Sequence, residues 1–359
     1  MKAYVLYGVN ELKYEEVKTP QPERGNVLVK VAAAGICGSD IPRIYQTGAH
    51  RHPLIPGHEF SGTVVKAGDR ESEVWVNKRV GVFPLIPCRK CIPCKKQEYE
   101  MCRNYNYLGS RCDGGFAEYV AVPKENLIEL PADVSFEEAA MLEPMSVAVH
   151  AMRMVMYHDG VHEAGRDDNA HVVVYGLGTI GLLLVMFLLE SGVKKLSVVG
   201  NKEFQKKCTK KLGLGMEDFC DSRSENVEEW VLEKTEGKGA DIVFECIGKN
   251  TTIEDSVNMA APGGRLVFVG NPSSDILFGR QTYWKILRNQ LKIRGTWNSS
   301  FTGSQKDDWH YVIKKLANGS VAPSALISHR FSLEDMEHGF KIMRDKSEDY
   351  VKIMGIFQN

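Results

Sequence analysis

The chain has 359 residues, with 43% hydrophobic and 25% charged side chains and a formal net charge of -1. This length exceeds the usual size of one hydrophobic core, so we expect two domains. The charge shows no basic excess or stripe of the kind that binds nucleic acid, and no apolar run is long enough to span a membrane. Without a signal-peptide pattern at its start, the sequence predicts a cytoplasmic protein with neither a nucleic-acid nor a membrane partner.

Short strand patterns separated by glycine, proline and charged turns fill residues 1–146. Among them are AYVLY, VLVKVAAA, SGTVVKAG and FAEYVAV, and a series of this kind is typical of a mostly β domain. The segment VKIMGIF near the C-terminus has the same character. We therefore expect residues 291–359 to return and complete this first domain.

Three residues of the first domain are candidate ligands of an open metal site. Cys37 in AAAGICGSD comes directly after a strand, and both it and His58 in PLIPGHEFSG lie at strand ends flanked by glycine. Glu143 in MLEPMSVAVH supplies a carboxylate near the domain boundary. A thiolate, an imidazole and a carboxylate leave the fourth position of a zinc ion free for substrate. Asp40 and Glu59 are then expected to orient the ligand imidazole. Taken singly, these residues are more often structural, and a solvated charge is the alternative for the last two.

Four cysteines follow in a C-x2-C-x2-C-x7-C pattern, and these are Cys88, Cys91, Cys94 and Cys102. In a cytosolic chain such thiols stay reduced, which favours metal ligation over disulfides. Four thiolates close the coordination shell of a zinc ion, so this site would stiffen its loop. An iron–sulfur cluster, or a set of free thiols, is the alternative.

Between residues 147 and 290, strand patterns such as HVVVYG, LSVVG, DIVFECIG and RLVFVG alternate with longer helical patterns. This alternation predicts a parallel sheet, and an α/β fold for the chain. The first strand runs into a glycine-rich turn and a helix, which is the arrangement that binds a pyrophosphate. The candidate cofactor-binding residues of this turn are Gly176, Leu177, Gly178, Thr179, Ile180 and Gly181.

The end of the second strand of this domain bears on the choice of cofactor. An NAD site normally has an acidic residue there, which binds the ribose 2′-hydroxyl. This chain has Gly200, Asn201 and Lys202 instead. Loss of the carboxylate removes repulsion against a 2′-phosphate, and the lysine and the amide could bind it, so the sequence favours NADP(H). The alternative is that Lys202 is an ordinary surface residue and that NAD is used.

With these motifs in place, the chain resembles the zinc-containing medium-chain dehydrogenases, the group of alcohol, sorbitol and threonine dehydrogenases, over essentially its whole length. The motifs CGSD from Cys37, GHExxG from Gly57, the four-cysteine lobe, EPxxVxxH from Glu143 and GLGTIG occur in the order of the family. The resemblance implies a GroES-like, mostly β catalytic domain (1–146 with 291–359) and a Rossmann domain with a doubly wound parallel sheet (147–290). It also implies two zinc ions per chain and a homodimer or homotetramer.

The resemblance also implies roles for individual residues. Cys37, His58 and Glu143 match the catalytic zinc ligands, and Glu59 matches a carboxylate that can approach the metal. Ser39 matches the hydroxyl that relays the substrate proton, and Asp40 matches the residue that braces the histidine. The four cysteines of the lobe match structural zinc ligands.

The predicted activity is oxidation of a secondary hydroxyl of a sugar alcohol, or of a sugar-alcohol phosphate, to the ketone with NAD(P). Basic groups that could bind a phosphate are Arg43, His50, Arg51, His52 and Arg111, because guanidinium groups suit phosphate geometry. Solvated or cofactor-contacting charges are an equal alternative. A secondary-alcohol, sorbitol or threonine dehydrogenase is the nearest rival function. A non-catalytic protein that binds a nucleotide and zinc is the alternative from another class.

Overall fold

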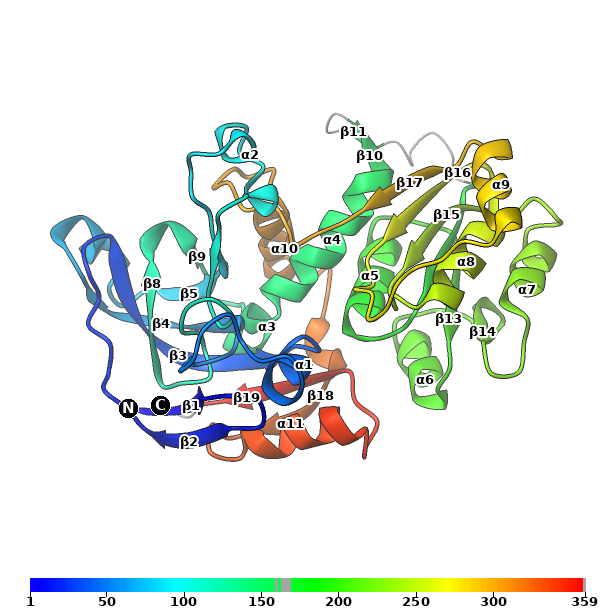
Figure 1. The fold of residues 1–359 in the computed structure, drawn as a ribbon. Helices are drawn as coiled ribbons and strands as arrows, with labels where there is room; N and C mark the ends of the chain where they lie inside the picture. Colours follow the sequence, from blue (N-terminus) through cyan, green and yellow to red (C-terminus); the bar gives the residue numbers. More distant parts are fainter. Residues whose placement is uncertain (159–160, 163–168, 358–359) are drawn as a thin grey trace. The chain divides into compact units, whose positions relative to one another are not determined.

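The computed structural model describes residues 1–158, 161–162 and 169–357. The chain forms two compact units (Figure 1), of which unit 1 comprises Met1–Pro144 with Ser299–Asn359 and unit 2 comprises Met145–Asn298. Both ends of the chain therefore contribute to unit 1. Among the described residues, no helix is both long and apolar enough to cross a membrane.

Unit 1 is built on a seven-stranded sheet with the order β18-β19-β3-β4-β5-β9, in which β8 also pairs with β3. The long strand β3 is central because nearly all of its residues are apolar and both of its faces are buried. All pairs in this sheet are antiparallel except β18 with β19. The strands are β3 (Asn26–Ile36), β4 (Glu59–Ala67), β5 (Arg79–Val82), β8 (Tyr119–Pro123), β9 (Leu127–Glu129), β18 (Ile327–Phe331) and β19 (Lys352–Ile356).

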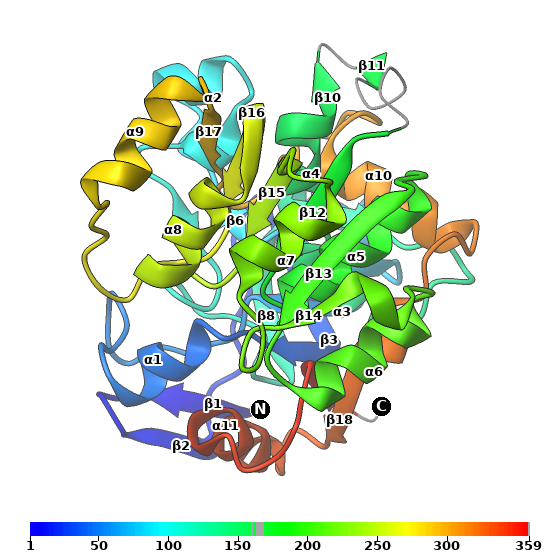
Figure 2. The same cartoon turned by 90° about the vertical axis from the view of Figure 1, so that its right-hand side faces the viewer.

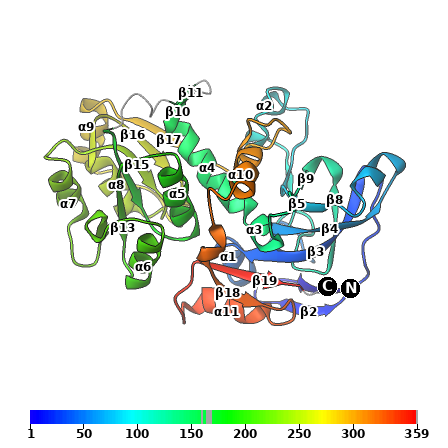
Figure 3. The ribbon, with the colours of Figure 1, turned by 180° about the vertical axis from the view of Figure 1, so that it is seen from behind.

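The C-terminal segment joins this sheet as the VKIMGIF pattern predicted. Strand β19 pairs antiparallel with β3, and Ile353 lies opposite Ile36 at the end of β3. Helix α11 (Met336–Asp345) packs on β18 and β19 (Figure 3), and its Phe340 is buried in the same hydrophobic cluster as these isoleucines. The last strand of the chain therefore lies beside the residues that lead into Cys37.

Shorter elements complete unit 1. Strands β1 and β2 form one hairpin, and β6 and β7 pair separately. Helix α3 begins with a capping box in which Ser135 and Glu138 exchange hydrogen bonds. The bounds are β1 (Lys2–Leu6), β2 (Leu12–Glu16), β6 (Leu85–Ile86), β7 (Asn106–Tyr107), α1 (Asp40–Tyr45), α2 (Ile92–Lys95), α3 (Phe136–Ala140) and α10 (Asp308–Ala317). Helix α4 (Leu142–Met156) begins in unit 1 and continues into unit 2.

Unit 2 contains a six-stranded, fully parallel sheet with the order β14-β13-β12-β15-β16-β17. Figure 2 shows α5 and α6 on one side of these strands and α8 and α9 on the other. This doubly wound arrangement confirms the predicted fold class. The strands are β12 (His171–Tyr175), β13 (Lys195–Gly200), β14 (Phe219–Asp221), β15 (Ala240–Glu245), β16 (Ala260–Phe268) and β17 (Lys292–Gly295), and the short strands β10 (Tyr157–His158) and β11 (Val161–His162) pair separately. The helices are α5 (Thr179–Glu190), α6 (Glu203–Lys211), α7 (Val227–Lys234), α8 (Asn250–Asn258) and α9 (Arg280–Arg288).

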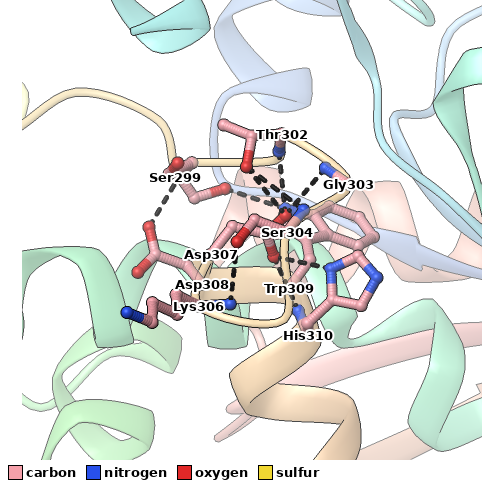
Figure 4. A network of polar contacts seen from close by, with 10 residues as sticks. Ser299, Thr302, Gly303, Ser304, Lys306, Asp307, Asp308, Trp309 and His310 are labelled. Atoms are coloured by element: carbon pink, nitrogen blue, oxygen red, sulfur yellow. Dashed lines mark hydrogen bonds and ion pairs between the residues drawn. The ribbon is translucent and has the colours of Figure 1, made fainter. Parts of the chain in front are cut away.

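A polar network fixes the segment at which the chain re-enters unit 1 (Figure 4). Asp307 caps α10, and its Oδ2 accepts hydrogen bonds from the N–H groups of Thr302 (2.8 Å) and Gly303 (3.1 Å). The indole N–H of the buried Trp309 donates to Ser299 Oγ at 3.0 Å. The network satisfies the first N–H groups of the helix and ties the preceding loop to it.

Candidate active site

Three candidate metal ligands meet where β3 ends and β4 begins. Because these strands are antiparallel neighbours, with Gly35 opposite Glu59, the residue that follows one strand lies beside the start of the other. One ligand atom each of Cys37, His58 and Glu59 lies within 4.8 Å of the other two. His58 and Glu59 are buried, whereas Cys37 is partly exposed. The pairing of two strands thus gathers a thiol, an imidazole and a carboxylate.

Asp40 supports this group from the first turn of α1. Its Oδ2 accepts a hydrogen bond from the N–H of Cys37 (3.0 Å), and its Oδ1 lies 3.5 Å from Nδ1 of His58. Arg43, one turn later, donates to the same Oδ1 at 2.5 Å. The buried aspartate therefore sits between the histidine and a guanidinium, as expected for a residue that orients the imidazole.

The charges of this group shift one another's protonation. Burial alone would raise the pKa of Asp40, but His58 and Arg43 lower it below its ordinary value. Burial alone would lower the pKa of His58, but Asp40 and Cys37 raise it well above its ordinary value. The negative charges around the imidazole therefore favour a cation at this site.

A buried lysine from the C-terminal strand neutralises Glu59. Lys352 Nζ lies 2.5 Å from Glu59 Oε2 and 3.2 Å from the carbonyl oxygen of Ile36, and it is only 1% exposed. Burial would lower the pKa of this ammonium, but Glu59 and Cys37 raise it. Residue 35 must be glycine here, because a Cβ would come within 2.3 Å of the glutamate oxygen.

Glu143 lies near this group without belonging to its closest set. The three residues whose ligand atoms meet are Cys37, His58 and Glu59, so Glu143 as third ligand stays a prediction. Its buried carboxylate accepts a hydrogen bond from the Tyr107 hydroxyl at 3.1 Å. Burial raises the pKa of Glu143 to about 7, against the effect of His58. Burial and Glu143 in turn raise the pKa of Tyr107 well above its ordinary value.

Ser39 precedes α1 and is exposed. Its side chain makes no capping hydrogen bond to the helix, although serine often does so at this position. The hydroxyl is thus not used by the helix, and its predicted role in proton relay stays a prediction.

The donor atoms of this site fit a zinc ion. Thiolate, imidazole and carboxylate are the ligand types that zinc binds in catalytic sites. Nδ1 of His58 is buried and lies 3.5 Å from Asp40 Oδ1. The aspartate therefore occupies this side of the imidazole, which leaves the other ring nitrogen as the one that could bind a metal.

The four cysteines of the loop also converge. Each offers a sulfur within 4.8 Å of the others, and the Cys91–Cys94 and Cys91–Cys102 sulfur distances are 3.4 and 3.9 Å. Hydrogen bonds from the N–H groups of Arg103 and Cys94 lower the pKa of Cys91 to about 6, whereas burial raises that of Cys94 to about 12. None of the four forms a disulfide. Four free sulfurs in one cluster fit a closed tetrahedral metal site.

The glycine-rich turn in unit 2 has the backbone geometry that the sequence predicted. Gly176 has a φ of 104°, which L side chains rarely adopt. A Cβ at Gly178 would meet nothing within 4 Å, so the start of α5 stays open to a ligand. At Gly181, a Cβ would come within 1.9 Å of the Gly176 oxygen. Gly176 thus allows the tight turn, Gly178 keeps the approach to the backbone open, and Gly181 allows the close packing of α5 on the turn.

The end of β13 has no room for an acidic side chain. A Cβ at Gly200 would lie 2.8 Å from Gln205 Oε1 and 3.0 Å from Leu177 Cδ1. Gln205 is held there, because it accepts from the N–H of Asn201 (2.9 Å) and donates to the oxygen of Leu177 (3.2 Å). Lys202 follows directly and is the residue before α6.

Sequence reasoning missed two residues of the active-site group. Lys352 was visible only as a charged residue at the start of an apolar strand, a pattern that often marks a strand end facing solvent. Tyr107 lies in the two-residue strand β7, where the sequence has no distinctive spacing. Both enter the site through folding of distant segments, with Lys352 and Glu59 separated by 293 residues.

Comparison with known proteins agrees with this architecture. The models for the alcohol dehydrogenase GroES-like domain and for the zinc-binding dehydrogenase match residues 23–132 and 179–318. Galactitol 1-phosphate 5-dehydrogenase of Escherichia coli K12 is 33% identical over 308 residues, 86% of each chain. L-threonine 3-dehydrogenase of Bacillus licheniformis is 32% identical over 337 residues, 92% of each chain.

Solved structures extend the likeness to the whole chain. The crystal structure of galactitol-1-phosphate dehydrogenase from Escherichia coli has a TM-score of 0.88 at 30% identity and covers 99% of this chain and 100% of its own. A putative zinc-binding dehydrogenase from Sinorhizobium meliloti, bound to NADP, has a TM-score of 0.87 at 26% identity, with 99% and 98% covered. The predicted family is confirmed. The chain belongs to the zinc-dependent medium-chain alcohol and polyol dehydrogenases and is an oxidoreductase.

Proposed function

We propose that this enzyme oxidises a secondary hydroxyl of a sugar alcohol or sugar-alcohol phosphate, of the galactitol 1-phosphate kind, to the ketone with a nicotinamide cofactor. The observation that carries the proposal is the cluster of Cys37, His58 and Glu59 at the joined ends of β3 and β4. The relatives that act on galactitol 1-phosphate and threonine both oxidise a secondary alcohol, which supports the reaction type.

A zinc ion and a nicotinamide cofactor would supply the central chemistry of the proposed reaction. A bound zinc ion lowers the pKa of an alcohol hydroxyl, and a bound nicotinamide accepts the hydride. Cys37 and His58, with Glu143 or Glu59 as the carboxylate, would hold the metal. Asp40 orients the imidazole, and the Ser39 hydroxyl passes the proton that leaves the substrate on toward solvent. The four-cysteine cluster would hold a second, structural zinc, so two zinc ions per chain are proposed.

The cofactor proposal rests on the turn after β12 and on the end of β13. The start of α5 is open, and the N–H groups in the first turn of a helix point toward an anion such as a pyrophosphate. At Gly200, the crowding by Gln205 leaves no place for the carboxylate that NAD sites use. With Asn201 and Lys202 next to it, this end of the strand suits a 2′-phosphate, so NADP is the preferred cofactor and NAD the alternative.

The basic residues considered for a substrate phosphate fall into two sets. Arg51 is paired with Asp113 at 2.7 Å, and the His52 imidazole accepts from the N–H of Ala49 at 3.3 Å. Both side chains are therefore already engaged in holding their own loop, which argues against them as phosphate receptors.

The second set comprises Arg43, His50 and Arg111, of which Arg43 also pairs with Asp40. Arg111 lies over the ring of Tyr105 at 4.7 Å, and burial together with the charges of Arg111 and Arg43 lowers the pKa of His50. The two arginines therefore lie close enough to His50 to favour its neutral form. The proposed phosphate receptor is this set, and Arg111→Ala should raise KM for a phosphorylated polyol while leaving KM for the plain polyol unchanged.

The proposal includes a homodimer or homotetramer. Strand β17 is the last strand of the unit 2 sheet, and edge strands of this kind can pair with a second copy. Near it, Tyr283, Leu287 and Trp297 are 53%, 55% and 59% exposed. Large apolar side chains at a free sheet edge favour burial against another subunit.

A spectrophotometric screen tests the proposed function. Sugar alcohols, their phosphates, simple secondary alcohols and threonine are each offered with NAD and with NADP, and the metal content is measured in the same preparation. We expect turnover with polyols or polyol phosphates and two zinc ions per chain. Turnover with threonine or simple alcohols alone would favour the rival dehydrogenases. Binding of cofactor without any turnover would favour the non-catalytic alternative.

A further inference from the structure

A fully buried carboxylate stands at the last residue of β15, outside the sites described above. Oε1 of Glu245 accepts hydrogen bonds from the N–H groups of Ile247 and Gly248, both at 2.9 Å, and from the Thr252 hydroxyl at 2.7 Å. Oε2 accepts a further bond from Gly248 at 3.1 Å. Within the part of the chain that the structure describes, no basic side chain forms an ion pair with it. A buried charge without a counter-ion is costly, so these donors are what keep the carboxylate in place.

Glu245 connects the ends of three neighbouring strands. Its main-chain oxygen accepts from the N–H groups of Val269 (2.8 Å) and Gly270 (3.0 Å), just after β16. Its side chain holds Ile247, and Ile247 in turn packs so closely on Gly176 that a Cβ there would lie 2.4 Å from its Cγ1. The loops that follow β12, β15 and β16 therefore depend on one residue.

These three loops lie at the edge of the sheet where a dinucleotide binds. In a doubly wound sheet, the ligand occupies the carboxyl ends of the strands where the strand order reverses, which here is between β12 and β15. Strands β12 to β14 form one mononucleotide-binding half, and β15 to β17 form the other. The turn at Gly176 and the residues from Gly200 belong to the first half. The loop at Ile247 and Gly248 belongs to the second.

The loop after β15 has little freedom of its own. Gly248 has a φ of 81°, and a Cβ there would come within 2.6 Å of the Asn271 oxygen. Two loops thus touch backbone to backbone, and their relative position follows from the hydrogen bonds to Glu245. A change in that carboxylate would therefore move the walls of the second half directly, and would reach the first half only through the contact of Ile247 with Gly176.

We infer that Glu245 is a positioning residue for the nicotinamide half of the cofactor. Being fully buried, it does not contact the dinucleotide and acts through the main chain of Ile247 and Gly248. The inference rests on the proposed dinucleotide function and adds a residue that neither the glycine-rich turn nor the end of β13 contains.

The variant Glu245→Gln tests this role, because the amide keeps the side-chain shape but places an NH2 group where an acceptor is needed. Binding of NADPH and NADH is measured by calorimetry, beside binding of 2′,5′-ADP and 5′-AMP, which occupy only the adenosine half. We expect the dinucleotides to bind about tenfold more weakly, since the loss of a buried acceptor is worth about that factor. The adenosine fragments should bind within about twofold of wild type. In the protein without cofactor, the amides of Ile247 and Gly248 should exchange hydrogen faster.

Ser256→Ala is the matched control. This buried hydroxyl donates to the Thr252 oxygen at 2.7 Å in the same helix, so its loss lowers stability without freeing the loop. Its dinucleotide and fragment affinities should match wild type. Thr252→Val removes a single bond to Glu245 and should weaken dinucleotide binding in the same direction by about threefold, which keeps the test open if Glu245→Gln does not fold.

Two results would overturn the inference. Dinucleotide affinity unchanged in Glu245→Gln and Thr252→Val would show that the loop does not depend on the carboxylate. Equal weakening of dinucleotides and adenosine fragments would show a general loosening of unit 2. Wild-type protein that bound neither dinucleotide nor fragment would instead overturn the proposed function, and this inference with it.

Discussion

The two metal-ligating clusters of unit 1 differ in how the chain assembles them. The four cysteines of the loop lie within fifteen consecutive residues, Cys88 to Cys102, and their spacing alone brings the sulfurs together. The active-site group instead draws on the ends of β3 and β4, on α1, on α4 and on β19. A closed site of local origin can form around a metal early, whereas the open site requires the folded sheet.

The clusters also differ in charge balance. The cysteine cluster gathers four thiols, so a metal ion bound there would compensate the charge of their thiolates. The active-site group already contains Arg43 beside Asp40 and Lys352 beside Glu59. Part of its negative charge is therefore neutralised by protein, which leaves it less dependent on metal for folding.

Replacement of one ligand in each cluster should have the largest effect. Cys37→Ser should lower kcat/KM by about a thousandfold or more, because the metal supplies several kcal/mol of transition-state stabilisation. Zinc content should fall from two ions per chain to one. The measurements are steady-state kinetics and metal analysis of the purified protein.

Cys91→Ser is the counterpart in the loop. It should also remove one zinc, but the remaining ion should be the catalytic one, so residual activity should stay well above that of Cys37→Ser while thermal stability falls. Equal turnover in Cys37→Ser and wild type would refute the assignment of the open site. Loss of both ions in either variant would refute the separation of the two clusters.

The buried lysine gives the next largest effect. Lys352→Met should lower the free energy of unfolding by about 3–5 kcal/mol, because it leaves the Glu59 carboxylate buried without its partner. Denaturant unfolding measures this loss. We expect a smaller loss in zinc-loaded than in zinc-depleted protein, since a bound metal also compensates Glu59.

Lys78→Met is the control for this prediction. Lys78 pairs with Glu129 at 2.6 Å, but both side chains are substantially exposed, at 34% and 55%. Exposed pairs contribute about 1 kcal/mol at most. If the two variants lost similar stability, burial of the Lys352 pair would not be what makes it important.

The contrast between the clusters explains which features of the molecule could be predicted from the sequence alone. The cysteine spacing and the glycine-rich turn are local patterns, and both have the predicted geometry. The meeting of Cys37 with His58 could also be anticipated, because each lies at a strand end flanked by glycine. The carboxylate that lies closest to these two residues could not be anticipated, since it depends on the strand register that places Gly35 opposite Glu59.

The other residues that the sequence did not predict also owe their positions to long-range strand pairing and tertiary contacts. Lys352 reaches the site because β19 pairs with β3, and a pairing between segments more than 300 residues apart leaves no trace in local spacing. The role of Glu245 was equally hidden, because an acidic residue at the end of a strand usually indicates a solvated turn. Buried charges are poorly predicted from sequence because their partners are set by tertiary contacts.

A smaller effect is expected where the chain returns from unit 2 to unit 1. Asp307→Ala removes the cap of α10 and its bonds to Thr302 and Gly303. The free energy of unfolding should fall by about 1–2 kcal/mol, as for other N-cap losses. Unfolding in urea checks this value, and metal analysis should show both zinc ions retained. Loss of either ion would mean that this network supports one of the clusters.

The smallest effect lies at the other end of the β3–β4 pair, away from the active site. Asp69 accepts hydrogen bonds from Ser72 and from the N–H of Gly25, and these bonds lower its pKa to about 2. Because the pKa of Asp69 in the folded protein is below the ordinary 3.8, its ionised carboxylate stabilises the fold above pH 3.8. This stabilisation is lost as the pH falls toward 2. Thermal unfolding should therefore show Asp69→Asn less stable than wild type at pH 5 and the two converging near pH 2. The zinc content at pH 7 should be unchanged, because strand pairing at the ligand end does not depend on this turn. If the difference in thermal stability between Asp69→Asn and wild type stayed constant with pH, the charge of Asp69 would contribute nothing to stability. A loss of zinc in the variant would show that the open site depends on the whole length of the β3–β4 pair.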